Sequence, residues 1–491
     1  MNIRIGFLHN RRNLKVKFKG NYSVSGLEGR VTDRTVAGRS YELNLLDSVP
    51  AEHQWYEKLD TFFDITKMES YRQKYDPDEI STRTVKAGKK IGLSDNFEYW
   101  IMKKAPDMSG KIYPSGDFRY KKLVKKEADG EIGFSGARYR KKIVFIPENR
   151  NCSFSVEGVR VGIDFHWDHT EDLEYSGGLE VMIDNSGGLT AINIVDLEDY
   201  LASVNSSEMR NDNNIEMLKA QTVAARSTVL ATMGKHHFEE GFDLCSDDHC
   251  QCYQGIGKIS ELSLRVAEET KGEVLMFDSR FADARYSKIC GGVTERYSAC
   301  WEDRDLPYLA SFYDRHNGEE VVSEMSENET RTFIDNTEND CFCNTFRHKL
   351  PKSLSFCKDL FRWEVSVSIV DIEKNLKIKF GKEIGEIKNI EAVQRGRSGR
   401  IINLIVSGSD GVVIIGKELN VRRLLSDTHL PSSAFYITRD HECFILKGAG
   451  WGHGVGLCQI GAQIMGESGY DYKQILKHYY RGASVRRTDG I

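Results

Sequence analysis

The chain has 491 residues and a formal net charge of −5 at pH 7, from 68 lysines and arginines against 73 aspartates and glutamates. With 40% hydrophobic residues and only 8 prolines it is predicted to fold, and its acidic balance argues against a protein that coats nucleic acid. No apolar run approaches the roughly 18 residues that a membrane-spanning helix needs, and the length predicts roughly two to four domains.

The N-terminal part of the chain is predicted to hold short strands followed by an accessory region. Residues 1–46 alternate charged and aliphatic side chains, which indicates strands. Residues 1–20 contain no continuous apolar stretch, so no signal peptide is seen and this segment alone predicts a cytoplasmic location. Residues 47–145 interleave aromatic and basic side chains, which either form the core of a small mixed domain or stack on sugars or bases.

The apolar period changes from two to about 3.6 after residue 196, which predicts a pair of helices. Asp196 is a good N-cap for a helix at 197–204, and apolar residues recur at three- and four-residue steps over 215–233. The polar residues 205–213 between them are predicted to form a loop held by two packed helices. Loops held in this way often carry catalytic side chains.

The predicted fold class is α+β, because strands and helices are mixed without a regular alternation. We expect a two-lobed core with a substrate cleft, together with an accessory N-terminal region and an insertion. The predicted parts are N-terminal strands (1–46), the accessory or inserted region (47–145), the first part of the core (146–314), the insertion (315–360) and the second part of the core with a glycine-rich loop (361–491).

A carboxylate in the predicted loop is the first candidate for chemistry. Glu208 lies next to helices that can shield it from water, and a shielded carboxyl group has a raised pKa that suits a general acid near neutral pH. Lys219 and Arg226 lie seven residues apart on one stripe of the following helix, so one of them can reach back to the loop. The alternative is a solvated glutamate without a partner.

A cluster of cysteine and histidine follows the second helix. Cys245, His249 and Cys250 offer thiolate and imidazole ligands, which suit zinc, and an upstream histidine, His236 or His237, can complete a tetrahedron. A closed site with four protein ligands would be structural. The spacing is not that of a zinc finger, so the alternative of buried reduced thiols without a metal stays open.

Two glycine-containing segments complete the set of candidates. In residues 448–459 glycine recurs at every second position, which lets the backbone approach a ligand or another strand closely, and no nucleotide-binding pattern fits this segment. Trp451 can stack on a sugar ring and His453 can bind a hydroxyl group, unless the segment is only a structural turn. Cys290, which precedes a Gly-Gly turn, is conceivable as a nucleophile with His249 or His453.

Together these segments resemble the family of stage II sporulation protein D and the related amidase enhancers. The resemblance covers roughly residues 159–483, and several separate motifs in the right order argue against a chance match. The similar segments are Asp196-Leu197-Glu198-Asp199-Tyr200-Leu201, Ser207-Glu208-Met209, Leu218-Lys219-Ala220-Gln221-Thr222-Val223-Ala224-Ala225-Arg226, Cys245 to Tyr253, Gly291-Gly292-x-Thr294-Glu295 and Gly450-Trp451-Gly452-His453-Gly454-Val455-Gly456 with Gln459.

The resemblance implies a peptidoglycan lytic transglycosylase. Such an enzyme cleaves MurNAc-GlcNAc glycan strands, here those stripped of stem peptides, to 1,6-anhydro products. The resemblance assigns the catalytic acid and base to Glu208, with assistance from Arg226, and one carboxylate suffices for this reaction. No second carboxylate of the kind that glycoside hydrolases use is indicated. The residues expected to bind substrate are Lys219, Tyr286, Trp451, His453 and Gln459.

The resemblance also implies a structural zinc ion, held by Cys245, His249, Cys250 and an upstream histidine, for which His237 is our choice. The expected partners are peptidoglycan glycan strands and a cell-wall amidase, with no nucleic acid and no membrane span. The cell envelope is the expected location, although no signal peptide is seen. The alternative function is a non-catalytic glycan-binding protein that enhances an amidase, and a third interpretation is a cytoplasmic sensor of metal or redox state.

Overall fold

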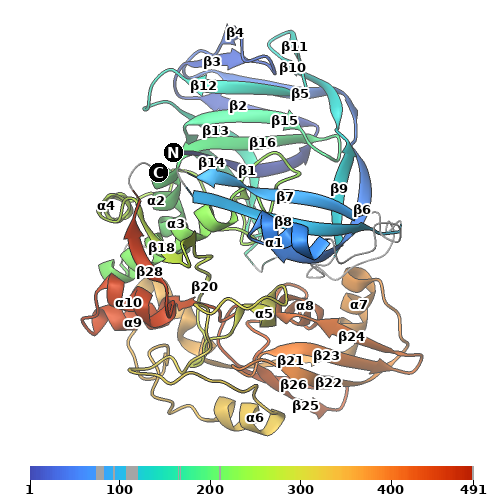
Figure 1. The fold of residues 1–491 in the computed structure, drawn as a ribbon, viewed down its shortest axis with the longest axis vertical. Helices are drawn as coiled ribbons and strands as arrows, with labels where there is room; N and C mark the ends of the chain where they lie inside the picture. The colour runs from blue at the N-terminus through green and yellow to red at the C-terminus, as the bar shows by residue number, and fades with distance from the viewer. Residues whose placement is uncertain are drawn as a thin grey trace.

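The computed structural model describes residues 1–72, 82–91, 94–106, 120–163, 165, 167–209 and 212–488, and it combines several sheets with helices (Figure 1). The predicted α+β class is confirmed. Large apolar cores lie between the N-terminal sheets, around the central helices and within residues 363–446. Within the described part of the chain, no helix is long and apolar enough to cross a membrane.

Two large sheets share the N-terminal core. Strands from the first 50 residues pair with strands that follow residue 128, so both sets form one body. The seven-stranded sheet has the order β17 (Leu244–Cys245), β1 (Asn2–Arg11), β16 (Leu189–Asp196), β15 (Gly178–Ile183), β12 (Lys142–Pro147), β3 (Tyr22–Ser25) and β4 (Val31–Arg34). The six-stranded sheet has the order β11 (Ala137–Arg140), β10 (Asp129–Phe134), β5 (Ser40–Val49), β2 (Asn13–Phe18), β13 (Ser153–Val161) and β14 (His169–Ser176).

A four-stranded sheet, which we call the accessory sheet, is inserted between β5 and β10. Trp100 is buried there with Val85 and Leu123 and packs edge-on against Phe238 of the central region, so this aromatic residue serves a small core. The strands after residue 128 leave this sheet and join the two large ones. The accessory sheet has the order β7 (Thr82–Ile91), β8 (Ser94–Lys104), β6 (Glu52–Phe62) and β9 (Tyr120–Lys126), with α1 (Ile65–Arg72) against it.

A buried carboxylate joins the accessory sheet to the central region. Glu98 on β8 forms ion pairs with Lys235 at 3.4 Å and with Arg304 at 3.2 Å, and it accepts a hydrogen bond from Trp100 Nε1 at 3.2 Å. Burial by itself raises the pKa of Glu98, but the charges of Lys235 and Arg304 outweigh it and lower the pKa to about 2. The ionised carboxylate therefore stabilises the docked sheet.

Two helices between the large sheets and the C-terminal region form an antiparallel hairpin (Figure 1). The first, α2 (Leu197–Glu208), begins at Asp196, whose Oδ1 accepts a hydrogen bond from the N–H of Glu198 at 3.0 Å. The second, α3 (Ile215–Thr232), is buried at every residue from Ala220 onward. Both helices were predicted, and α3 is the centre around which the neighbouring elements pack.

The predicted loop at 205–213 is partly wrong, because α2 continues to Glu208. Asn205 does not compete with the helix backbone, since its side-chain amide donates hydrogen bonds across to α3, to Leu218 O at 3.0 Å and Thr222 Oγ1 at 2.8 Å. The end of the helix comes at Met209, which is extended and buried. Residues 210 and 211 of the predicted loop lie outside the described residues.

The elements around α3 come from the second half of the chain. A two-residue parallel ladder joins β20 (Tyr286–Ser287) to β27 (Leu457–Cys458), which brings the Gly-Gly turn beside the glycine-rich loop. The helices and strands of this region are α4 (Glu261–Glu269), β18 (Glu273–Phe277), β19 (Arg280–Phe281), α5 (Tyr297–Cys300), α9 (Gln459–Glu467), α10 (Tyr472–Tyr479) and β28 (Ser484–Arg487).

The C-terminal region holds two three-stranded sheets, one with β26 (Cys443–Ala449) in the middle and the other with β23 (Ile401–Gly408) in the middle. The first strand of this region, β21 (Arg362–Ser368), ends at Ser368, because Ser368 caps the following helix. Residues 315–360 contain α6 (Glu327–Asp335) and the 3₁₀-helix η1 (Lys352–Leu360). The other elements are α7 (Ile369–Phe380), β22 (Ile387–Arg395), β24 (Val412–Gly416), α8 (Glu418–Leu424) and β25 (Phe435–Asp440).

Replacing Glu98 by glutamine is expected to lower the free energy of unfolding at pH 7 by about 3 kcal/mol, because two buried cations lose their partner. A lowered pKa stabilises the fold only where the carboxyl group of the unfolded chain, with its ordinary pKa of 4.5, is already ionised. The difference between wild type and variant should therefore shrink as the pH falls from 4.5 toward 2, which urea unfolding at a series of pH values measures. The control Glu131→Gln removes an exposed pair with Arg138 and should cost less than about 1 kcal/mol. Equal losses in the two variants would contradict this role of Glu98.

Candidate active site and metal centre

Glu208 is the last residue of α2 and lies between two other segments of the chain. Its Oε1 accepts a hydrogen bond from the N–H of Cys252 at 3.4 Å. Its backbone carbonyl accepts one from Lys288 Nζ at 3.2 Å, and a cation at this end of a helix is favourable because the helix dipole is negative there. The helix end thus holds the carboxylate beside both the cysteine-histidine segment and the Gly-Gly turn segment.

A second carboxylate lies beside Glu208. One oxygen of Glu208, one oxygen of Asp248 and the sulfur of Cys252 all lie within 4.8 Å of one another. Although the Asp248 side chain reaches solvent, the protein around it and the charge of Glu208 raise its pKa to about 6. The sequence indicated no second carboxylate, because Asp248 is 40 residues away in the chain and only the fold brings it to α2.

Tyr286 borders the same site from β20. Its hydroxyl group is buried and has no hydrogen-bond partner among the described residues. Burial, and then the negative charge of Glu208, raise the pKa of this tyrosine well above its ordinary value. The hydroxyl group of Tyr286 is thus neutral and lies within the electrostatic influence of the Glu208 carboxylate.

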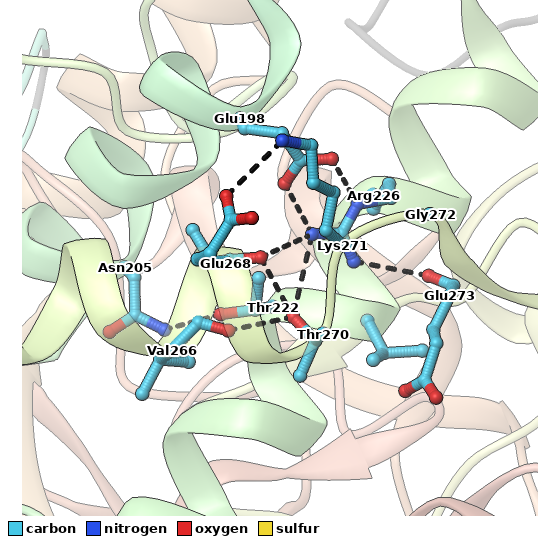
Figure 2. A network of polar contacts seen from close by, with 12 residues as sticks. Glu198, Asn205, Thr222, Arg226, Val266, Glu268, Thr270, Lys271, Gly272 and Glu273 are labelled. Atoms are coloured by element: carbon cyan, nitrogen blue, oxygen red, sulfur yellow. Dashed lines mark hydrogen bonds and ion pairs between the residues drawn. The ribbon is translucent and has the colours of Figure 1, made fainter. Parts of the chain in front are cut away.

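Arg226 lies in a network of polar contacts with Glu198, Thr270 and Glu273 (Figure 2). Its guanidinium group is fully buried and pairs with Glu198, through Nε at 3.1 Å and Nη2 at 2.5 Å. It also donates to the carbonyl of Glu273 at 3.1 Å and, more weakly, to Thr270 Oγ1 at 3.4 Å. Glu198 and Glu208 are ten residues apart on α2, which is roughly 15 Å of helix. The structure therefore does not bring Arg226 to Glu208.

Two of the residues expected to bind substrate also have other partners. Lys219 pairs with Glu216 at 3.2 Å and with Glu269 at 2.9 Å. Gln459 is buried at the start of α9, where its amide donates to Gln221 at 3.4 Å. Both side chains hold elements of the central region together, and neither of these contacts reaches Glu208.

Trp451 is joined to the Glu208 region through the backbone. Trp451 and Ile289 exchange two backbone hydrogen bonds, of 2.8 and 3.1 Å. Lys288, the residue before Ile289, donates a hydrogen bond to the backbone carbonyl of Glu208. Trp167 and Phe356 pack edge-on against the Trp451 ring, with centroids 5.9 and 5.8 Å away. Trp167 and Phe356 are 38% and 56% exposed, so this aromatic group faces solvent. The sequence analysis missed both residues, since neither belongs to a recognisable pattern.

His453 and the glycines around it have a clear structural function. His453 Nδ1 accepts a hydrogen bond from the N–H of Val455 at 3.0 Å, and its ring packs against Trp301. Burial, and then the charges of Arg285 and Arg400, lower the pKa of His453 well below its ordinary value, so the ring is neutral. Gly454 has a φ of 74°, and a Cβ there would lie 2.4 Å from the guanidinium carbon of Arg400, which only glycine avoids.

The predicted metal ligands do come together. Cys250 Sγ lies 3.3 Å from His237 Nε2 and 3.6 Å from His249 Nδ1, and Cys245 Sγ lies 3.9 Å from His249 Nδ1. Ligand atoms around a tetrahedral zinc ion are about 3.6 Å apart, given zinc distances of about 2.1 Å to nitrogen and 2.3 Å to sulfur. The donor set therefore fits zinc. We call these four residues the Cys2His2 group.

His237, and not its neighbour His236, supplies the upstream imidazole. The other ring nitrogen of His237, Nδ1, lies 3.2 Å from Glu240 Oε2, and a carboxylate behind the imidazole is typical of metal-binding histidines. His236 packs beside the His249 ring, with centroids 5.5 Å apart, but it contributes no atom to the group. His237 was our choice from the sequence, and the turn after α3 is what brings its ring, and not that of His236, to Cys250.

Cys290 does not contact either histidine that was considered as its catalytic partner. Its Sγ lies 3.3 Å from Asp314 Oδ2 and 3.5 Å from Cys343 Sγ, and burial raises the pKa of the thiol well above its ordinary value. A buried, protonated thiol is a poor nucleophile. The structure thus gives no support to a nucleophilic Cys290.

Comparison with known proteins covers the central and C-terminal regions. Residues 185–277 match the family described as Stage II sporulation protein, and residues 295–456 match a domain of unknown function, DUF8618. The relatives include an uncharacterised protein of Brachyspira hyodysenteriae (26% identical, over 64% of this chain and 72% of the relative), the amidase enhancer of Bacillus subtilis (26%, over 58% and 40%) and stage II sporulation protein D of Bacillus amyloliquefaciens (22%, over 60% and 76%).

Residues 185–277 thus define a Stage II sporulation protein domain, which contains α2, α3 and the Cys2His2 group. The chain is similar to stage II sporulation protein D and to the amidase enhancer over about 60% of its length, and the resemblance seen in the sequence is confirmed. This chain spans less than half the length of the amidase enhancer that it matches.

Two glutamates of α2 allow a sharp comparison. Glu198→Gln is expected to lower the free energy of unfolding by about 3–5 kcal/mol, because it leaves the buried charge of Arg226 uncompensated. Glu208→Gln, at the half-buried end of the same helix, is expected to change it by less than about 1 kcal/mol. Thermal and urea unfolding of the two variants measure the difference. Similar losses in both variants would show that Arg226 does not depend on Glu198.

Proposed function

We propose that this protein acts on cell-wall glycan strands as a lytic transglycosylase, with Glu208 as both acid and base. The proposal is carried by the convergence of Glu208, Asp248 and Tyr286, which come from α2, the segment after β17 and β20. Relatives named amidase enhancer and stage II sporulation protein D support a role in the cell wall. The cell envelope is accordingly the proposed place of action.

Glu208 is proposed to carry the whole proton cycle. Its carboxyl group gives a proton to the glycosidic oxygen as the bond from that oxygen to C1 of N-acetylmuramic acid breaks. The carboxylate then takes the proton of the C6 hydroxyl group while O6 bonds to C1, so a 1,6-anhydro ring closes and no water is consumed. Glu208 ends the cycle protonated, as it began.

Asp248 and Tyr286 are proposed to act on the sugar ring beside Glu208. The transition state of glycoside cleavage carries positive charge near C1, and a fixed carboxylate a few ångströms away stabilises that charge. The Tyr286 hydroxyl, which has no partner among the described residues, can bond a sugar hydroxyl group. We therefore assign the assisting role to Asp248 and not to Arg226. Arg226 is regarded as a residue that positions α2 through its ion pair with Glu198.

The glycan strand is proposed to run over the aromatic group formed by Trp167, Trp451 and Phe356. Exposed aromatic rings stack on the apolar faces of sugars, and this group continues from the segment that contacts Glu208. It also connects the loop after β13 with the glycine-rich loop after β26, on opposite sides of the proposed cleft. The cleft predicted from the sequence would lie along this line.

A non-catalytic function is the second candidate, because one relative is named an amidase enhancer. In that case the same aromatic surface would bind glycan and promote the action of a cell-wall amidase, while Glu208 would not react. The two functions differ in one respect that can be measured, which is whether the glycosidic bond is cut.

Glu208→Gln is expected to lower the formation of 1,6-anhydromuramyl products by about 10²–10⁴-fold, because the variant can neither give nor take the proton. The measurement incubates wild type and variant with intact and with peptide-stripped peptidoglycan and identifies the products by mass spectrometry. Glu216→Gln, which replaces a half-buried carboxylate in the first turn of α3, is the control and should retain activity.

Three outcomes would contradict the lytic mechanism. Ordinary reducing ends in place of anhydro products would indicate hydrolysis with Asp248 as the second carboxylate. Equal activity of the wild type and Glu208→Gln would remove Glu208 from the reaction. Glycan binding without cleavage, with the stimulation of an amidase unchanged by Glu208→Gln, would establish the enhancer function.

We further propose that the Cys2His2 group binds a structural zinc ion. Four protein ligands close the coordination shell, so the ion would hold the turn after α3 against the segment of Cys252 and Asp248, both of which contact the Glu208 site. Its contribution would be to the position of these residues and not to a chemical step.

The variant His237→Gln is expected to lose the zinc of this group, whereas His236→Gln is expected to keep it, because of these two neighbours it is His237 that points a ring nitrogen at Cys250. Zinc measured in the purified proteins by inductively coupled plasma mass spectrometry gives the result. Loss of zinc from His236→Gln alone would reverse the assignment, and a wild type without zinc in this group would refute it.

A further inference from the structure

Three cysteines and an aspartate from distant parts of the chain meet in the interior. Cys290 precedes the Gly-Gly turn, Cys343 follows α6, and Cys458 ends β27 and caps α9, while Asp314 lies in the loop before residues 315–360. Each of the four is at most 2% exposed. We call them the Cys3Asp group, and one ligand atom from each lies within 4.8 Å of the other three.

The distances suit a tetrahedral metal ion. Cys290 Sγ lies 3.5 Å from Cys343 Sγ and 3.3 Å from Asp314 Oδ2. Two thiolates on zinc are about 3.8 Å apart, and a thiolate and a carboxylate oxygen about 3.6 Å, given zinc distances of about 2.3 and 2.1 Å. Both observed distances are a few tenths of an ångström shorter than these values, so a small outward adjustment of the side chains reaches the geometry of a zinc site.

The surroundings orient the carboxylate as they would for a ligand. Asp314 Oδ1 accepts a hydrogen bond from Tyr479 at 2.9 Å and lies 3.1 Å from His478 Nε2, which leaves Oδ2 facing the cysteines. Hydrogen bonds to a metal-binding carboxylate from behind are typical of metal sites. A fully buried carboxylate needs a strong partner, and a dication among three thiolates supplies it.

Backbone donors and arginine side chains lie close to the cysteines. The N–H groups of Cys290 and Gly461 donate to Cys458 Sγ at 3.3 and 3.4 Å. Arg400, which is buried, donates to the carbonyl of Cys290, and Arg362, which is half-buried, donates to that of Gly291, so two cations lie on the same turn. Three thiolates and a carboxylate around a zinc ion carry a net charge of −2, which these groups offset.

We propose that Cys290, Cys343, Cys458 and Asp314 bind a second zinc ion. Soft thiolates in a closed, four-ligand tetrahedron select zinc over magnesium or calcium. Through Cys343, the ion would link residues 315–360 to two segments that border the candidate active site, one containing Cys290 and the other Cys458. The segment of Cys290 also contains Lys288, which donates a hydrogen bond to the carbonyl of Glu208. The segment of Cys458 follows Trp451, whose backbone pairs with that of Ile289. This inference depends on neither the glycan activity nor the zinc of the Cys2His2 group.

The metal content of the full chain, purified under reducing conditions, tests the proposal. The double variant His249→Gln/Cys250→Ser disrupts the Cys2His2 group and leaves the Cys3Asp group intact, so it is expected to retain one zinc per chain. Adding Cys343→Ser, or the isosteric Asp314→Asn, is expected to remove that zinc. Cys152→Ser replaces a buried cysteine of the N-terminal core and is the control, with its zinc unchanged.

Cobalt gives a second readout that needs no variant of the Cys3Asp group. Cobalt exchanged into His249→Gln/Cys250→Ser is expected to show thiolate-to-metal charge-transfer absorption of the strength that three thiolates give, because the disrupted Cys2His2 group retains only Cys245 whereas the Cys3Asp group supplies three cysteines. A double variant that binds neither zinc nor cobalt, or a disulfide between Cys290 and Cys343 found by mass spectrometry, would overturn the proposal and identify the group as packed or redox-active thiols. If the double variant does not fold, Cys343→Ser in the wild-type chain must lose one zinc for the proposal to stand.

Discussion

A guanidinium group buried at the centre of the helical region constrains the structure around it. Burying a charge costs several kcal/mol unless it is paired and its remaining hydrogen atoms are bonded. Arg226 meets this need with partners from three elements, namely Glu198 on α2, Thr270 at the end of α4 and the carbonyl of Glu273 on β18. These elements therefore have fixed positions around α3, and a helix shifted by one turn would leave the charge without a partner.

The same constraint sets the position of the candidate catalytic residue from a distance. The N-terminal end of α2 is held by Asp196 and by the pair with Arg226, and its last turns are held by the Asn205 side chain. A helix held at several points along its length presents its final side chain at a defined place. Glu208 thus needs few contacts of its own, and its carboxylate stays accessible to a ligand.

The sequence predicted what local patterns encode. The Asp196 cap and the 3.6-residue period located α2 and α3, and residue type alone selected Cys245, His249 and Cys250. The end of α2 was placed too early, because a run of polar residues predicts a loop unless their partners across the hairpin are known. In the same way, only the turn after α3 decides that His237 and not His236 approaches Cys250.

Contacts between distant segments could not be predicted. The proximity of Asp248 to Glu208, and of Trp167 to Trp451, follows from the packing of whole sheets and helices. Such packing produces no periodic pattern in the amino-acid sequence. The partner of Arg226 is an instructive exception. In an antiparallel hairpin a residue eleven positions into the second helix lies opposite a residue about as far before the end of the first, which points to Glu198 and away from Glu208.

The accessory sheet enters and leaves the fold at a single place. Val49, near the end of β5, is paired with Asp129, at the start of β10, so the chain departs from one strand of a hairpin and returns to its neighbour. The whole of the four-stranded sheet is thus a very long hairpin loop, whose two ends are about 5 Å apart. In evolutionary terms such a segment can be gained, lost or exchanged without changing how any strand of the two large sheets is paired. For protein engineering, this is the position at which a foreign domain can be grafted onto the fold.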